Sequence, residues 1–170
     1  MAMASRQMGI YTGQKGQKDL ALGLDPGRDK TGFAFVSLDG NLLVSGIFPS
    51  SETVKFFADF TPYIIERRID SEIHGFIQRV KFIAVGDGTT SRKFTEHVKV
   101  ITGHEIITVD ERNTTLEARG LYWKIHTPGF FMSLIPESMR VPKRVLDDLA
   151  AWAVALRGLK KYRDIRRNKL

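Results

Sequence analysis

Acidic residues stand at the ends of apolar segments in three places along the chain. Asp25 follows the run Leu20–Leu24 just before a Pro-Gly pair, and Glu111 comes shortly after the run Glu105–Val109. Asp147 opens a long alanine-rich segment near the C-terminus. Carboxylates that meet at one site can hold two divalent ions about 4 Å apart, an arrangement suited to hydrolysis of a phosphodiester bond. The acids at these three places are therefore candidate catalytic and metal-binding residues: Asp25, the pair Asp110 and Glu111, and the pair Asp147 and Asp148.

Each of these acids also has an ordinary structural interpretation. Asp25 taken alone fits a turn aspartate as well as it fits a ligand, and Asp147 suits the first turn of a helix, where negative charge is favourable. Glu111 could form a surface ion pair with Arg112, of little energetic consequence. Asp87 lies in an Asp-Gly pair, which indicates a turn. Asp110 and Asp148 are further candidate metal ligands from the same two places.

The composition narrows both the metal and the partner. The chain has 170 residues, no cysteine and a formal net charge of +7. Without thiolates, and with four histidines that lack zinc-site spacing, oxygen ligands favour Mg²⁺ or Mn²⁺. The positive charge favours a nucleic-acid partner. Because no run is long enough for a signal peptide or a membrane span, we expect a cytoplasmic protein with no membrane partner.

Basic residues near the acids are candidate contacts for the phosphates of a nucleic acid. Lys30 and Arg112 lie beside the candidate catalytic acids, and Lys143 and Arg144 precede the last alanine-rich segment. More cations follow from Arg157 onward, where they suit a helix end as well as they suit phosphate contacts. Lys30, Arg112, Lys143 and Arg144 are therefore our candidate nucleic-acid-binding residues.

The segment Thr127–Leu134 concentrates apolar side chains in a proline- and glycine-containing stretch. Its residues Phe130, Phe131 and Met132 are consecutive. Exposed aromatic rings can stack on unpaired bases, but large apolar side chains are more often buried. We favour packing of these three side chains into the core.

The elements that must position the acids can be predicted from periodicity and turn residues. Residues 20–24, 31–38 and 42–48 are apolar and joined by tight turns, which predicts an antiparallel meander. Residues 81–86 and 105–109 predict two further strands. Helical spacing or composition predicts helices over five ranges: 54–69, 71–79, 91–102, 114–125 and 145–162. A loop is expected between the last two helices. Together these elements predict an α/β fold with a mixed five-stranded sheet flanked by helices.

The chain is expected to form one domain. Residues 1–19 are polar and without periodicity, which predicts a flexible N-terminal tail. Residues 20–162 carry all the predicted elements, and residues 163–170 form a basic C-terminal tail.

Three motifs in order resemble the YqgF/RuvX-type family of the ribonuclease H-like superfamily, which is related to RuvC. They are LGLDPGRDKTGFAFV (22–36), VDERNTTLEAR (109–119) and LDDLAAWAVALRGL (146–159), and the second is the most specific. The sequence departs from the family at Pro26, which is more similar to RuvC-type resolvases. It also departs at VGDGTTSR (85–92), where the family has Gly-Leu-Pro, and residues 52–80 are long for the family. RuvC-like enzymes carry an acidic ligand near the end of this strand, so the resemblance makes Asp87 a further candidate metal ligand, although we prefer the turn.

The resemblance implies a ribonuclease H-like fold and a nuclease whose acids, here Asp25, Glu111 and Asp147, hold two Mg or Mn ions. Family members are described as processing a ribosomal RNA precursor or as putative Holliday-junction resolvases. The implied partner is therefore structured RNA or branched DNA, bound by a monomer or a homodimer. The alternative is a non-catalytic nucleic-acid-binding module that retains the fold. Actin-like and sugar kinases also begin with an Asp-Gly hairpin, but this chain is too short for their two lobes.

Overall fold

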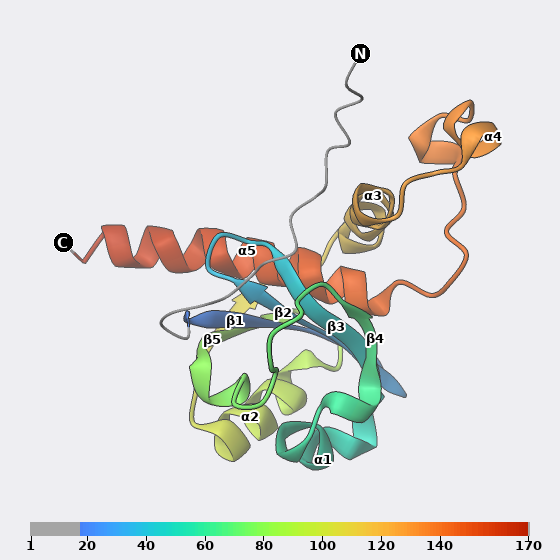
Figure 1. Ribbon diagram of the computed structural model, residues 1–170. Helices are drawn as coiled ribbons and strands as arrows, with labels where there is room; N and C mark the ends of the chain where they lie inside the picture. The colour runs from blue at the N-terminus through green and yellow to red at the C-terminus, as the bar shows by residue number, and fades with distance from the viewer. Residues whose placement is uncertain (1–17, 170) are drawn as a thin grey trace.

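The sheet begins with the antiparallel meander that the turns predict (Figure 1). In the computed structural model, which describes residues 18–169, β1 (Leu20–Pro26) pairs with β2 (Lys30–Ser37), and β2 pairs with β3 (Leu42–Pro49). β5 (Val80–Gly86) lies parallel to β1, and β6 (Glu105–Val109) lies parallel to β5. All the predicted strands are therefore present. The carboxyl ends of β1, β5 and β6 lie at one edge of the sheet.

A further strand makes the sheet six-stranded, in the order β4-β3-β2-β1-β5-β6. β4 (Ile64–Arg67) pairs antiparallel with β3, so the predictions of five strands and of a helix through residues 54–69 are wrong. The helix α1 (Thr53–Ala58) occupies only the start of that range. Pro62 then lies in the 3₁₀ turn η2 (Thr61–Tyr63). Proline disrupts a continuing helix, and the β-branched residues after it favour an extended edge strand.

The two faces of the sheet carry side chains of very different size. One face is covered by aromatic and large aliphatic residues, among which the rings of Phe48 and Phe56 stack with centroids 4.2 Å apart. The other face carries small residues and packs against the long helix α5 (Asp147–Arg167). A methyl group on Gly23 would lie 2.1 Å from the carbonyl oxygen of Ala151. Glycine in β1 therefore permits the close approach of α5 to the sheet.

The remaining helices agree in part with the periodicity. α2 (Ser91–Thr102) is capped by Gly103, whose φ of +67° suits a left-handed helix cap. α3 (Thr114–Ile125) has the predicted bounds. The predicted helix over 71–79 is wrong, because only the 3₁₀ turn η3 (Ile77–Arg79) forms there. α5 begins at the second residue after the predicted start and continues five residues beyond Tyr162. Three short elements complete the chain: η1 (Ser50–Glu52), α4 (Phe130–Ser133) and η4 (Glu137–Met139).

Most of the predicted N-terminal tail, residues 1–17, lies outside the described residues. Over residues 18–169, no helix is both long enough and apolar enough to span a lipid bilayer.

Candidate active site

Asp25 lies near the end of β1, on the face of the sheet that packs against α5. Leu20, Leu22 and Leu24 point into the phenylalanine-rich core, so the alternation of the strand turns Asp25 to the opposite face. The side chain is partly buried. Its pKa rises from 3.8 to about 6, first because burial disfavours the charged form and then because Glu111 and Asp147 add negative charge.

Asp147 reaches this position because the first residue of α5 lies directly on β2. A methyl group on Gly32 would lie 2.0 Å from the carbonyl oxygen of Asp147, so only glycine fits there. Gly32 is also the residue of β2 that pairs with Asp25. The start of α5 is therefore set against the strand residue beside Asp25.

Glu111 lies beyond β6, and its carboxylate folds back over the end of β5. A methyl group would lie 2.9 Å from Oε2 of Glu111 if added to Gly86, and 2.4 Å from Oε1 if added to Gly88. The backbone N–H of Glu111 donates to Oδ1 of Asp87 at 3.1 Å. Asp87 therefore holds the backbone that carries Glu111, and its predicted roles as a turn residue and as a metal ligand stay predictions.

Arg157 of α5 fixes the same loop from the other side. Its guanidinium donates to the carbonyl oxygens of Asp110 and Arg112, the residues that flank Glu111, and to the carboxylate of Glu117. The sequence placed Arg157 among surface cations with a phosphate or helix-end role. Its function in the structure is to position the Glu111 loop, and no local motif indicates this, because the contact joins residues more than forty positions apart.

Asp25, Glu111 and Asp147, which we call the carboxylate cluster, come from β1, the loop after β6 and the start of α5. They are close enough that the charges of the other two raise the pKa of Asp25. Within residues 18–169, however, no three acidic, histidine or cysteine side chains are drawn tightly around a single point where an ion would sit. The structure thus brings the predicted acids to one region, but their side chains are not arranged as a complete metal-coordination site.

The chemistry of the carboxylate cluster fits a hard divalent cation. Oδ2 of Asp147 is buried and has no hydrogen bond among the described residues. Lys30 Nζ does lie 2.7 Å from this oxygen, so the contact is an ion pair outside hydrogen-bond geometry. A buried carboxylate oxygen that is paired only with an exposed ammonium group, beside an acid of raised pKa, is a suitable ligand for Mg²⁺ or Mn²⁺. Asp25, Glu111 and Asp147 are the described residues that could hold such an ion.

Asp148, the next residue of α5, belongs to a different arrangement. Its side chain is 0% exposed. Arg144 Nη1 donates to its Oδ1 at 2.6 Å, and Ser45 Oγ donates to its Oδ2 at 2.7 Å. The predicted role of Asp148 as a metal ligand and of Arg144 as a phosphate contact stay predictions, but these bonds give both side chains a structural role.

Glu66 of β4 extends this arrangement to the loop between α3 and α5. Its Oε1 lies 3.1 Å from Arg144 Nη2 and 2.6 Å from Nε2 of His126. We call Ser45, Glu66, His126, Arg144 and Asp148 the buried ion-pair network. Sequence reasoning missed Ser45, Glu66 and His126, because their meeting depends on the strand β4 that the periodicity did not predict.

The other predicted residues lie at the surface around the carboxylate cluster. The guanidinium of Arg112 binds both carboxylate oxygens of Asp110, and this hydrogen bonding lowers the pKa of Asp110 to about 2. Lys30 and Lys143 are exposed. Lys30 contacts the carboxylate cluster through its ion pair with Asp147.

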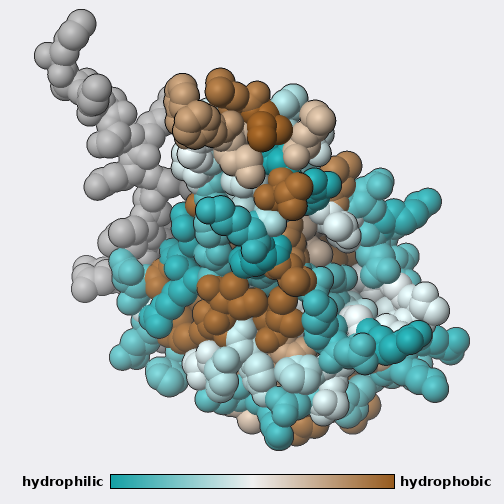
Figure 2. Space-filling view, turned by 90° about the vertical axis from the view of Figure 1, so that its right-hand side faces the viewer, coloured by the Kyte–Doolittle hydropathy of each residue, from teal (hydrophilic) through white to brown (hydrophobic). Residues whose placement is uncertain are grey.

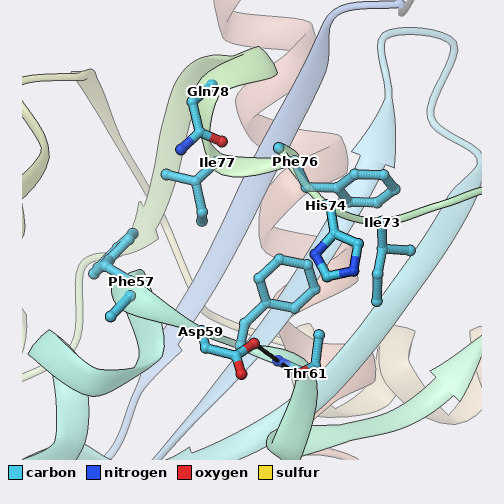
Figure 3. Close-up of a pocket in the computed structure, with 11 residues that line it drawn as sticks. Phe57, Asp59, Thr61, Ile73, His74, Phe76, Ile77 and Gln78 are labelled. Carbon is cyan, nitrogen blue, oxygen red and sulfur yellow. Dashed lines mark hydrogen bonds between the residues drawn. The ribbon is translucent and has the colours of Figure 1, made fainter.

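A pocket on the other face of the sheet is separate from these acids (Figure 3). Figure 3 shows Asp59 hydrogen-bonded to Thr61 near His74, with the side chains of Phe57 and Phe76 along the walls. Its volume of about 90 Å³ is well below the ~300–1,000 Å³ of typical small-molecule sites. This pocket is too small for a nucleotide and does not contribute to the carboxylate cluster.

The chain matches no protein-family model, and no curated protein matches it.

Proposed function

We propose that this protein is a Mg²⁺- or Mn²⁺-dependent endonuclease of the ribonuclease H-like fold that hydrolyses phosphodiester bonds in structured RNA or branched DNA. The observation that carries the proposal is the approach of Asp25, Glu111 and Asp147 from three separate elements, with the pKa of Asp25 raised to about 6. Three antiparallel strands followed by two parallel ones, β5 and β6, support the resemblance to the YqgF/RuvX-type family.

Each member of the carboxylate cluster has a defined role in this proposal. Asp25, Glu111 and Asp147 would hold the ions through their carboxylate oxygens. Bound divalent ions would activate the attacking water and stabilise negative charge on the phosphate and on the leaving oxygen. Asp87 keeps the backbone of Glu111 in place. Lys30 lies at the rim beside Asp147, where its ammonium group can contact a substrate phosphate.

The reaction class follows from these roles. One water molecule is consumed, a new bond forms between its oxygen and phosphorus, and the bond from phosphorus to the leaving oxygen breaks. The proton lost by the water is balanced by the proton that the leaving oxygen acquires. No redox cofactor is needed for this exchange.

A second candidate is a non-catalytic nucleic-acid-binding module with the same fold. The ion pair between Lys30 and Asp147 at 2.7 Å favours it, because a lysine already supplies positive charge to one of the three acids. Under this proposal the basic surface binds phosphates and the acids have no catalytic role.

Cleavage assays separate the two candidates. The purified full chain, Asp25→Asn and Asp39→Asn are incubated with a four-way DNA junction or a ribosomal RNA precursor, with Mn²⁺ or with EDTA. Asp39 is an exposed residue of the β2–β3 turn and serves as the matched control. We expect metal-dependent cutting by wild type and Asp39→Asn and none by Asp25→Asn. Cutting that persists in Asp25→Asn overturns the proposal of a nuclease that uses the carboxylate cluster. Salt-sensitive binding without any cutting favours the non-catalytic binding module.

A further inference from the structure

The segment between α3 and α5, residues 126–146, projects from the body of the molecule, and we call it the flap. Figure 1 places its helix α4 on the side where α5 begins, away from the sheet. Phe130 is 75% exposed and Phe131 is 82% exposed. The prediction that these rings pack into the core is therefore wrong. The small-residue face of the sheet is already covered by α3 and α5.

The two exposed rings contact each other and form a pair. Their centroids lie 5.6 Å apart with an interplanar angle of 77°, so they meet edge to face. Other apolar side chains of the flap are also exposed, and Figure 2 shows hydrophobic residues gathered at the upper end of this face of the molecule. They are Leu134, Ile135, Met139, Val141 and Val145.

Arginine side chains hold the flap in shape. Arg140 Nε donates to the carbonyl oxygen of Ile135 at 2.8 Å, and its Nη2 donates to that of Ser133 at 3.2 Å. Arg119 of α3 in turn donates to the carbonyl oxygen of Arg140 at 3.2 Å. The exposed rings are thus presented by a segment with its own internal bonds.

The base of the flap is joined to the start of α5. His126 at one end and Arg144 near the other both contact Oε1 of Glu66. Arg144 also binds Asp148, the neighbour of Asp147. The flap and the carboxylate cluster therefore share a fixed connection through the first turn of α5.

The positive charge around the flap favours one kind of binding partner over another. Its polar surface is mainly cationic, with a single acidic residue between residues 118 and 146, Glu137. A second copy of the chain would bring one +7 molecule against another, which like-charge repulsion opposes. Exposed aromatic rings beside cations suit single-stranded nucleic acid, whose bases stack and whose phosphates are attracted. The basic residues in and next to the flap that lie outside the buried ion-pair network are Arg119, Lys124, Arg140 and Lys143.

We propose that the flap binds unpaired nucleotides of single-stranded nucleic acid, with Phe130 and Phe131 stacking on bases on the side of the molecule where α5 begins. This inference rests on the proposed function for its substrate class. It adds that the preferred substrate carries an unpaired segment.

Binding without cleavage tests the flap separately from the nuclease. Fluorescence anisotropy in EDTA measures the affinity of the full chain for a labelled single-stranded DNA or RNA of mixed sequence, against a blunt duplex of equal length. The double variant Phe130→Ala/Phe131→Ala is compared with Val100→Ala, which removes an equally exposed apolar side chain from α2. Because all three side chains are exposed, the variants retain the fold, which circular dichroism checks.

We expect the double variant to bind the single strand about tenfold to a hundredfold more weakly, with duplex binding and Val100→Ala unchanged. Unchanged single-strand binding in the double variant overturns the flap proposal, even if the wild type cleaves. Conversion of a dimer to a monomer in sedimentation, with oligonucleotide binding intact, also overturns it. If the double variant binds the single strand more weakly and the wild type never cleaves, the flap proposal is supported and the nuclease proposal is overturned.

Discussion

Asp147 and Asp148 are consecutive in α5, yet they lie in opposite electrostatic environments. Asp148 is fully buried and accepts hydrogen bonds from Arg144 and Ser45. Asp147 lies close enough to Asp25 for its negative charge to raise the pKa of that carboxyl, and it forms an ion pair with the exposed Lys30. One helix turn therefore carries a hydrogen-bonded ion-pair network on one side and a cluster with excess negative charge on the other.

The difference indicates which acids serve stability and which serve chemistry. A buried carboxylate that is fully hydrogen-bonded leaves its partner unpaired when it is removed, and that is costly. A carboxylate held beside like charges weakens the folded state, and such groups concentrate at functional sites. The same substitution, aspartate to asparagine, should therefore have opposite effects in the two regions.

The largest expected effect is in the buried ion-pair network. Asp148→Asn should lower the free energy of unfolding by about 3–5 kcal/mol, because it leaves the half-buried Arg144 guanidinium without its main carboxylate. Asp147→Asn is the matched control and should change it by less than about 1 kcal/mol. Urea denaturation measures both. Equal losses in the two variants would remove the distinction between the regions.

In the carboxylate cluster the sign should reverse. The pKa of Asp25 is raised from 3.8 to about 6 in the folded protein, so the folded state binds more protons than the unfolded state between those values. Stability should therefore fall as pH rises through this window, with the whole penalty present above pH 6. Asp25→Asn should stabilise the protein by up to about 3 kcal/mol at higher pH.

The pH series supplies the check on this prediction. The gain from Asp25→Asn should disappear below about pH 4, because Asp25 is then protonated in both states. Thermal unfolding of the two proteins across the pH range measures the gain. A variant that is less stable than wild type above pH 6 would show that the Asp25 charge is not destabilising.

A backbone contact sharpens the placement of Asp147. Gly32→Ala should lower the free energy of unfolding by about 1–3 kcal/mol, because the new methyl group would lie 2.0 Å from the carbonyl oxygen of Asp147. Gly129→Ala has no atom within 4 Å of the new methyl group and should be neutral to about 0.5 kcal/mol. If both variants unfold at the wild-type urea concentration, the close packing of α5 on β2 is wrong.

The smallest effect is expected at the rim. Lys30→Met should change the free energy of unfolding by less than about 1 kcal/mol, because the exposed ion pair with Asp147 contributes little. It should weaken nucleic-acid binding about equally across sequences and lower the salt dependence of binding by about one phosphate contact. Anisotropy titrations over a salt series measure this. An unchanged salt dependence would exclude Lys30 as a phosphate contact.

Much of the carboxylate cluster could be predicted from the sequence, because it depends on strand ends. Asp25 and Glu111 follow apolar runs that form the parallel strands β1 and β6, which have β5 between them, and Asp147 begins a strongly periodic helix. The buried ion-pair network could not be predicted in the same way. Ser45 and Glu66 are opposite each other only because β4 pairs with β3, and residues 54–69 have a period that resembles a helix.

The flap marks another limit of sequence patterns. Local hydrophobicity predicted burial for Phe130 and Phe131, but burial depends on whether the fold leaves space for the rings. The α5 side of the sheet is filled by small residues in close contact, as at Gly23 and Ala151. The meander and the helices α2 and α3 could be predicted because their turn residues and periodicity are local.

The most direct test of the central claim is calorimetric titration of the full chain with Mn²⁺ at neutral pH, beside Asp25→Asn, Glu111→Gln and the surface control Asp39→Asn. If Asp25, Glu111 and Asp147 form one metal site, wild type and Asp39→Asn should bind Mn²⁺ with equal affinity. Asp25→Asn and Glu111→Gln should each bind it at least about tenfold more weakly. Equal Mn²⁺ affinity in all four proteins would contradict the account.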